Sequence, residues 1–242
     1  MTAKFIYTGP SWAESSYDKW GSWEDKNKIN LAQQWQIPCI NHSRGATSVM
    51  NRVDCIKQLN HNLPIIWIYN EPIKDITTIT GLSTTEFIQR SDWFDVWQEC
   101  NYQCLKAISS LNQPVLLIGG HSDVVDCSHD NITVGHPSWQ RWIAEQAGLR
   151  VDNSKICVTI DDGTERLIKH CWGADVVHQL ICWHSDTKPS YEIVDAVHDM
   201  FLLWKHLEKS NLFFEVHPNR QANQQFAEFL LPVVQNFLQE AQ

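Results

Sequence analysis

Residues 63–70 read LPIIWIYN, an uninterrupted apolar run of strand length that ends in an asparagine. Runs of the same kind recur along the chain, and they are KFIYTG (4–9), IPCIN (37–41), QPVLLIGG (113–120) and NLFFEVH (211–217). Strands that are apolar throughout are buried on both faces, which is typical of parallel sheets covered by helices. The run at 63–70 therefore predicts a strand inside such a sheet.

Helical patterns separate these runs, and they cover residues 27–35, 46–60, 91–111, 189–209 and 220–240. Strands that alternate with helices form an α/β fold. We expect one domain over residues 1–242, a three-layer α/β/α sandwich around a mainly parallel sheet of about five strands. The run KICVTI at 155–160 predicts an additional strand, and the aperiodic segment 121–138 predicts a loop over the site.

The charge and the hydropathy of the chain exclude two kinds of partner. The formal net charge is −9 at pH 7, and no basic run is present that could neutralise the phosphates of a nucleic acid. No apolar stretch reaches the roughly 18 residues needed to span a bilayer, and the N-terminus has no apolar signal-peptide region. We expect a cytoplasmic protein whose eight scattered cysteines are buried, reduced thiols.

Residues that carry chemistry follow the predicted strands, at the edge where ligands bind in a doubly wound sheet. Ser11 follows the first strand, Gly45 the second, Asn70 the third, and His217 ends the last. A serine hydroxyl attacks a carbonyl when a histidine removes its proton. The backbone amides of Ser11 and Gly45 and the side-chain amide of Asn70 could donate hydrogen bonds to the resulting oxyanion.

This order of serine, glycine, asparagine and histidine resembles the four sequence blocks of the SGNH (GDSL-type) hydrolases. The blocks of this chain are GPS (9–11), NHSRGAT (41–47), IYNE (68–71) and FEVHPN (214–219). The resemblance implies the flavodoxin-like architecture of that family and an acyl hydrolase that needs no cofactor or metal. It also implies that Ser11 is the nucleophile, that His217 is its base, and that Gly45 and Asn70 line the oxyanion hole.

The chain departs from the family pattern most strongly at the acid that orients the histidine. The family has GDS and GxND where this chain has GPS and IYNE, and its aspartate lies three residues before the histidine, where Phe214 stands here. The candidate replacements are Glu215, Asp123 and Asp126. We expect the loop 121–138 to supply the partner of His217. Glu215 would share the face of His217 only if the strand continued through residue 217, and the proline after the histidine indicates that the strand turns there. A Ser-His dyad without an acid is the alternative.

Each site residue also has a purely structural interpretation. Ser11 suits a helix N-cap, Gly45 and Asn70 suit turns, and Asn219 suits the N-cap of the last helix. Their joint occurrence at successive strand ends favours catalysis. The opposing hypothesis is a binding or structural protein that keeps the fold while its catalytic residues have decayed, and Phe214 favours it.

Between residues 121 and 136 lies a second group of side chains, of types that ligate metals. No two of them have a zinc-site spacing, so a metal site is the weaker interpretation. The group comprises His121, Asp123, Asp126, Cys127, His129 and His136.

The chain has 12 tryptophans, several of which flank polar, turn-like segments. Wide aromatic side chains near loops favour an acylated carbohydrate substrate over a long-chain lipid, although they also serve as large core residues. The residues concerned are Trp12, Trp20, Trp23, Trp139, Trp142, Trp172 and Trp183.

Overall fold

The structure is a computed structural model of the 242-residue chain. The residues that it describes are 2–9, 13, 30–44, 48–59, 61–69, 75–120, 124, 127–148, 150–152, 157–159, 165–167, 187–207, 212–214 and 217–241. Within these ranges no helix combines the length and the apolar character needed to cross a membrane.

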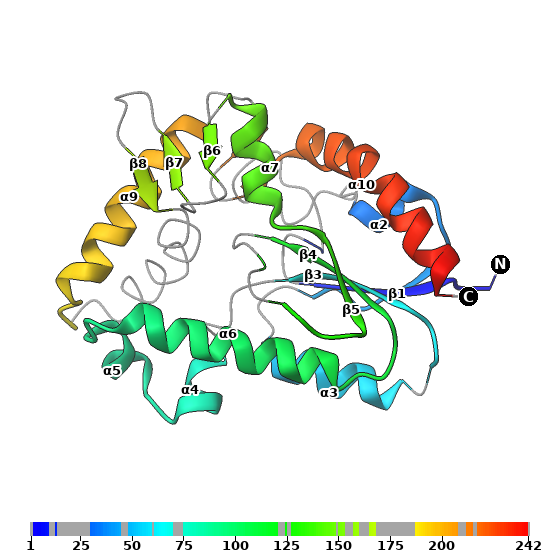
Figure 1. Cartoon of the computed structure of the whole chain (residues 1–242), viewed down its shortest axis with the longest axis horizontal. Helices are drawn as coiled ribbons and strands as arrows, with labels where there is room; N and C mark the ends of the chain where they lie inside the picture. The colour runs from blue at the N-terminus through cyan, green and yellow to red at the C-terminus, as the bar shows by residue number, and fades with distance from the viewer. Residues whose placement is uncertain are drawn as a thin grey trace.

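A five-stranded sheet lies at the centre of the molecule, and all of its neighbouring strands run parallel (Figure 1). Its strands are β1 (Phe5–Thr8), β2 (Cys39–Asn41), β3 (Ile65–Tyr69), β4 (Val115–Gly119) and β5 (Ile132–His136). Their order is β2-β1-β3-β4-β5. This is the flavodoxin-like order, whose topological switch point lies between β1 and β3. The expected fold class is confirmed.

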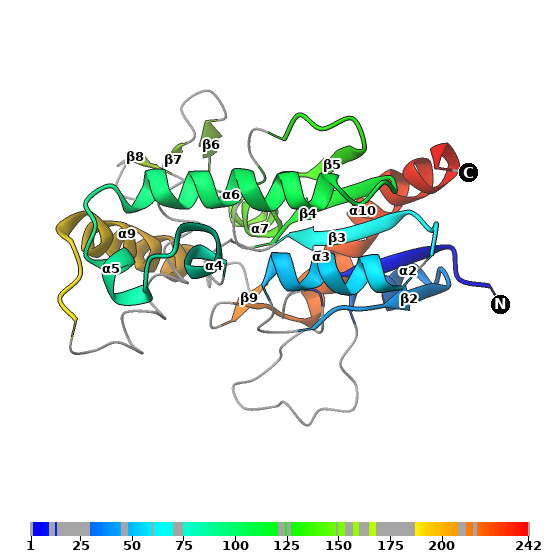
Figure 2. The same cartoon turned by 90° about the horizontal axis from the view of Figure 1, so that it is seen from below.

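Helices cover both faces of the sheet (Figures 1 and 2). On one face lie α3 (Val49–Gln58) and the C-terminal half of α6 (Trp93–Ser109). On the other face lie α2 (Leu31–Trp35), α7 (Trp139–Gln146) and α10 (Arg220–Glu240). The result is a three-layer α/β/α sandwich in which the sheet is the middle layer.

Alternate residues of each strand pack into different cores. In β3, Ile66 and Ile68 join the core beneath α7 and α10, whereas Ile65 and Trp67 join the core beneath α3 and α6. All positions of β1, β3 and β4 are buried. Burial on both faces explains why the sequences of these strands are continuous apolar runs and do not alternate between apolar and polar residues.

A further group of elements extends past the carboxyl edge of the sheet, at the end of the molecule opposite both termini (Figure 1). There α4 (Ile76–Thr80), α5 (Thr84–Ile88) and α9 (Tyr191–Leu207) pack against the N-terminal half of α6 in a third apolar cluster. An antiparallel sheet of β6 (Arg150–Asp152), β7 (Cys157–Thr159) and β8 (Glu165–Leu167) lies at the same end.

The predicted position of the fifth sheet strand is wrong. The described residues of the segment 211–217 form a separate pair: β9 (Phe213–Phe214) runs antiparallel to β10 (His217–Pro218). The fifth strand is β5, inside the segment predicted to be a loop. Because β5 is an edge strand in which Thr133 and Val134 are exposed, it lacks the continuous apolar pattern of the inner strands.

Most other predicted elements are confirmed, with ends that differ by a few residues. The helices expected at 46–60, 91–111, 189–209 and 220–240 are α3, α6, α9 and α10, and α2 is shorter than expected. The strand expected at 155–160 is β7, although it belongs to the separate antiparallel sheet. Short helices α4, α5 and α7 were not predicted.

The cysteines that the structure describes with their side chains are free thiols, as expected. Cys100 and Cys104 are buried one turn apart on α6, whereas Cys55 is exposed, contrary to the expected burial.

Candidate functional site

The predicted site residues fall largely outside the described residues. This holds for Ser11, Gly45 and Asn70, and for the candidate acids Glu215, Asp123 and Asp126. His217 is described as the first residue of β10, and its side chain is outside the description. Residues one or two positions before Ser11, Gly45 and Asn70 in the chain are described, and they show how the strand ends are arranged.

Two segments meet beyond the ends of β1 and β2. The backbone amide of His42 donates to the carbonyl of Tyr7 at 2.7 Å, and the amide of Arg44 donates to the carbonyl of Gly9 at 3.0 Å. The pairing of the two strands thus continues past their carboxyl ends. Gly9 lies two residues before Ser11, and Arg44 directly precedes Gly45.

The end of β3 is fixed on its other side. The amide of Gly120 donates to the carbonyl of Tyr69 at 2.8 Å, and the amide of Gln140, in α7, donates to the carbonyl of Gly120 at 3.2 Å. The Tyr69 hydroxyl donates to Oδ1 of Asn101 on α6 at 2.7 Å. The residue before Asn70 is therefore held from both helical layers.

Gly9 occupies a position that no larger residue fits. Its φ is +156°, and a Cβ there would lie 2.4 Å from the Cβ of Ala13 and 2.8 Å from both the Cβ and the carbonyl oxygen of Ile68. Ala13 is fully buried. Glycine thus allows the chain that leaves β1 to pass directly against β3, at the switch point of the sheet.

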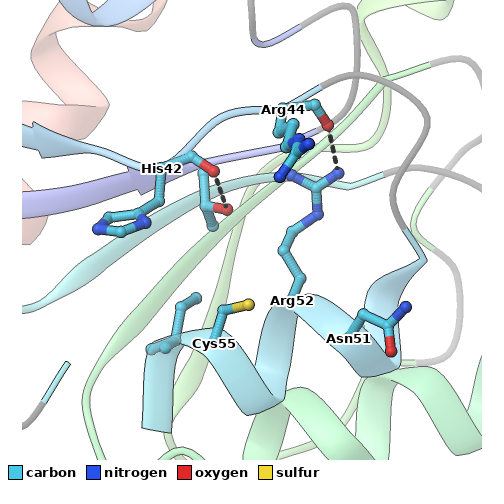
Figure 3. A pocket seen from close by; sticks show the side chains of 7 residues that line it. His42, Arg44, Asn51, Arg52 and Cys55 are labelled. Atoms are coloured by element: carbon cyan, nitrogen blue, oxygen red, sulfur yellow. Dashed lines mark hydrogen bonds between the residues drawn. The ribbon is translucent and has the colours of Figure 1, made fainter. Parts of the chain in front are cut away.

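Arg52 of α3 reaches the same strand ends although it is only 4% exposed (Figure 3). Its Nη1 donates to the carbonyl of Gly9, and its Nη2 donates to the carbonyl of Arg44 at 2.9 Å. One guanidinium group therefore holds the segment before Ser11 and the segment before Gly45.

The N-terminus of α3 is itself fixed by a buried carboxylate. Asp75 is fully buried and accepts hydrogen bonds from the amides of Val49 at 2.8 Å and Met50 at 3.1 Å. The Ser48 side chain accepts from the amide of Asn51 at 3.1 Å. These acceptors satisfy the first free amides of the helix and fix the element that carries Arg52.

A cavity of about 150 Å³ lies beside Arg52, between the end of β2 and α3 (Figure 3). Because ligand pockets for drug-sized molecules are about 300–1,000 Å³, this cavity suits only a small molecule or ion. Its lining residues are Thr8, His42, Arg44, Asn51, Arg52, Cys55 and Ile56.

The position of His217 is set by the start of α10. In the β9/β10 pair, Phe214 is the register partner of His217, so no single strand runs from 213 through 217. Asn219 is the N-cap of α10, as its structural interpretation predicts, and its side chain accepts from the amide of Ala222 at 2.9 Å. Since α10 packs on the sheet through residues such as Phe226, the backbone at 217 is anchored to the sandwich.

His136, a member of the predicted metal group, is a packed aromatic residue. Its ring contacts Phe226 and Phe229 edge-on, with centroids 5.6 and 5.4 Å away, and its Nδ1 lies 2.9 Å from the carbonyl oxygen of Ser138. Among the residues that the structure describes, no three histidine, cysteine or acidic side chains form a group that could hold a metal.

Two of the tryptophans assigned to a carbohydrate cleft are core residues. Trp139 is fully buried and stacks on Phe226, and Trp142 packs against the same ring at a centroid distance of 5.1 Å. The cleft interpretation is therefore wrong for these two. Trp12, Trp20, Trp23, Trp172 and Trp183 lie outside the described residues.

Sequence reasoning missed Arg52, although a signal was present. Val49, Val53 and Ile56 form the buried face of α3, and Arg52 falls on the same face of the helix. An arginine within an apolar helical face has to reach polar partners, because a buried charge without them is costly. Two of its partners are backbone carbonyls, which a sequence pattern does not reveal.

Comparison with known proteins gives one structural likeness. No protein-family model matches the chain, and no curated protein matches it. Among solved structures, the crystal structure of the protein YxiM from Bacillus subtilis is similar, with a TM-score of 0.40 and 11% sequence identity. The match covers 98% of this chain and 57% of that protein.

Proposed function

We propose that the chain is a single-domain serine ester hydrolase that works through an acyl-Ser11 intermediate. The observation that carries this proposal is the 3.0 Å hydrogen bond between the Arg44 amide and the Gly9 carbonyl. It joins the segment that leads to Ser11 with the segment that leads to Gly45, at the edge of a parallel sheet where ligands bind.

In the proposed reaction, the Ser11 Oγ attacks the ester carbonyl while His217 removes its proton. The tetrahedral intermediate then expels the alcohol, which takes that proton from His217. Water attacks the acyl-enzyme in the same way and releases the acid. Gly45 and Asn70 donate to the oxyanion, and the loss of one such donor raises the barrier by about 3 kcal/mol.

Three single substitutions would identify the group that orients His217. We propose a carboxylate or carbonyl of the segment 121–138, which contains β5, for this role, so Asp123→Ala or Asp126→Ala should lower kcat/KM more than Glu215→Ala. A loss confined to Glu215→Ala would refute the assignment to this segment. No loss in any of the three variants would indicate a carbonyl partner or a dyad.

The proposed substrate class is a small molecule or carbohydrate that carries a short acyl ester. With Trp139 and Trp142 in the core, this proposal rests on the other tryptophans that flank polar segments. Turnover of acetylated sugars should exceed turnover of long-chain acyl esters. The reverse preference would replace the carbohydrate by a lipid as the proposed substrate.

The second candidate is a non-catalytic binding or structural protein, which the phenylalanine at the acid position favours. Phe214 is the register partner of His217, and directly paired residues of antiparallel strands have their Cα atoms about 5 Å apart. If the site has decayed, Phe214→Asp should create activity that the unmodified chain lacks.

The test of the proposed function is the turnover of p-nitrophenyl acetate across a range of pH. The unmodified chain should be active, and its kcat/KM should fall as a histidine base becomes protonated, at about pH 6.5 for an ordinary imidazole. Ser11→Ala should abolish turnover. Ser43→Ala is the matched control. The Ser43 hydroxyl donates to Oδ1 of Asn41, two residues earlier, and has no proposed catalytic role.

A further inference from the structure

We infer that Arg52 is a positioning residue of this site, which sets the orientation and the donor strength of the Gly45 amide by holding the Arg44 carbonyl. The catalytic consequence rests on the proposed function; the structural coupling does not. Arg52 is not part of any motif that the sequence resemblance covers, and the contacts of its guanidinium group carry the inference.

The first step is the geometry of the two hydrogen bonds. Nη1 donates to the Gly9 carbonyl and Nη2 to the Arg44 carbonyl, which is 2.9 Å away. The guanidinium is planar and its donors are fixed relative to one another, so it sets the distance and angle between the two carbonyls. A lysine ammonium is a single point donor and cannot impose this geometry.

The second step is the covalent link between the Arg44 carbonyl and the Gly45 amide. The Arg44 carbonyl and the Gly45 N–H belong to one peptide group, which is planar and, outside X–Pro bonds, almost always trans. In such a group the N–H is directed opposite to the C=O, so a donor that fixes the carbonyl also fixes the amide. A hydrogen bond to the carbonyl polarises the group as well, which makes its N–H a stronger donor.

The third step is the cost of burying a cation at this position. The neighbours of Arg52 on the inner face of α3 are Val49, Val53 and Ile56, so an apolar residue would complete that face. A buried guanidinium loses its hydration and is retained only where its hydrogen bonds compensate. The two carbonyls that accept from Nη1 and Nη2 belong to residues that precede proposed catalytic positions, so these two hydrogen bonds lie at the proposed site.

The coupling is tested by NMR without reference to activity. The chain has ten glycines, so spectra of 15N-glycine-labelled protein are simple enough to assign Gly45. Arg52→Met should shift the Gly45 amide nitrogen and the Arg44 carbonyl carbon, and Arg52→Lys should shift them less. Lys57→Met is the matched control, because it removes an exposed cation from the last turn of the same helix and should leave both resonances in place.

The catalytic consequence is tested by kinetics on the same variants. Arg52→Met should lower kcat about 10- to 100-fold and leave KM within about twofold, because the transition state depends on the oxyanion donor more than the bound substrate does. In Arg52→Ala, about 10 mM guanidinium, far below denaturing concentrations, should restore part of kcat. The cavity of about 150 Å³ beside the side chain gives the ion space to enter, and equal concentrations of sodium chloride should have no effect.

The outcomes separate the two proposals. If the unmodified chain shows no Ser11-dependent turnover, the proposed function fails and the NMR arm alone decides the coupling. If Gly45 and Arg44 resonances are unchanged in a folded Arg52→Met or Arg52→Lys protein, the coupling is refuted. If an active enzyme keeps its kcat in these variants, Arg52 has no positioning role. If sodium chloride restores kcat as well as guanidinium does, the rescue is an effect of ionic strength and does not support a positioning role for the Arg52 guanidinium.

Discussion

Replacing Gly9 by alanine should be among the most destabilising single-methyl additions in the sheet. The new Cβ would lie 2.8 Å from the backbone oxygen of Ile68 and 2.4 Å from the Cβ of Ala13, and neither is the flexible end of a side chain. Such overpacking costs about 1–3 kcal/mol. The φ of +156° adds about 1–3 kcal/mol for a residue with a Cβ. We expect Gly9→Ala to lower the free energy of unfolding by the sum of the two, about 2–6 kcal/mol.

Two other glycines separate the two contributions. Gly81 has a φ of +75° and open space around its Cβ position, so Gly81→Ala should cost only about 1–2 kcal/mol of backbone strain. Gly120 has no positive φ, but its Cβ would lie 2.9 Å from the carbonyl oxygen of Tyr69, so Gly120→Ala reports the close approach alone.

Urea unfolding of the three variants measures these costs directly, and thermal unfolding should show a loss of about 10 °C for Gly9→Ala in a chain of this size. The cost of Gly9→Ala should be near the sum of the other two. A Gly9→Ala protein no less stable than Gly81→Ala would refute the close packing of the chain after β1 against β3.

Three further predictions concern the layers around the sheet. Asp75→Asn removes one of the two Asp75 carboxylate oxygens that accept from α3 and should cost about 1–3 kcal/mol by urea unfolding, against about 0.5 kcal/mol for the exposed Asp95→Asn at the start of α6. Trp35→Phe removes the hydrogen bond that the buried indole donates to the Ala227 carbonyl at 2.9 Å and leaves a smaller ring in the core, so it should cost about 1–3 kcal/mol, measured in the same way. Burial raises the pKa of the Cys100 thiol to about 11 from an ordinary 9.0, so the folded chain keeps a proton that the unfolded chain releases. The free energy of unfolding should therefore fall as the pH rises between about 9 and 11. Urea titrations at both ends of this range should show a smaller fall for Cys100→Ala than for the unmodified chain. An equal fall in the two proteins would contradict the burial of this thiol.

The sequence predicted the inner sheet strands and the long helices because their burial leaves a clear pattern. A strand such as β3, buried on both faces, is apolar at every position, and α10 shows helical periodicity over its whole length. The edge strand β5 has exposed positions, so its pattern resembles that of a loop. The sequence of β9 and β10 resembles a strand of the main sheet because Phe213 and Phe214 continue an apolar run, and a local pattern carries no information on which sheet a strand joins.

The site was predictable only as a set of residue types at strand ends. Strand ends can be located from the apolar runs, and the sheet order brings the ends of β2, β1 and β3 together. What holds them there could not be read from the sequence. Gly9 is required by a contact with Ile68, and Arg52 bonds the carbonyl of a residue 43 positions away, so both roles depend on the packed structure.

The most direct test of the proposed function is covalent labelling of Ser11 by a fluorophosphonate, followed by mass spectrometry of the digested protein. We expect one phosphonyl adduct, on the peptide that contains Ser11. The adduct should be lost in Ser11→Ala and strongly reduced in His217→Ala, and it should be retained in Ser43→Ala. A folded protein that takes up no label, or one whose labelling persists unchanged in Ser11→Ala, would contradict the assignment of Ser11 as the nucleophile.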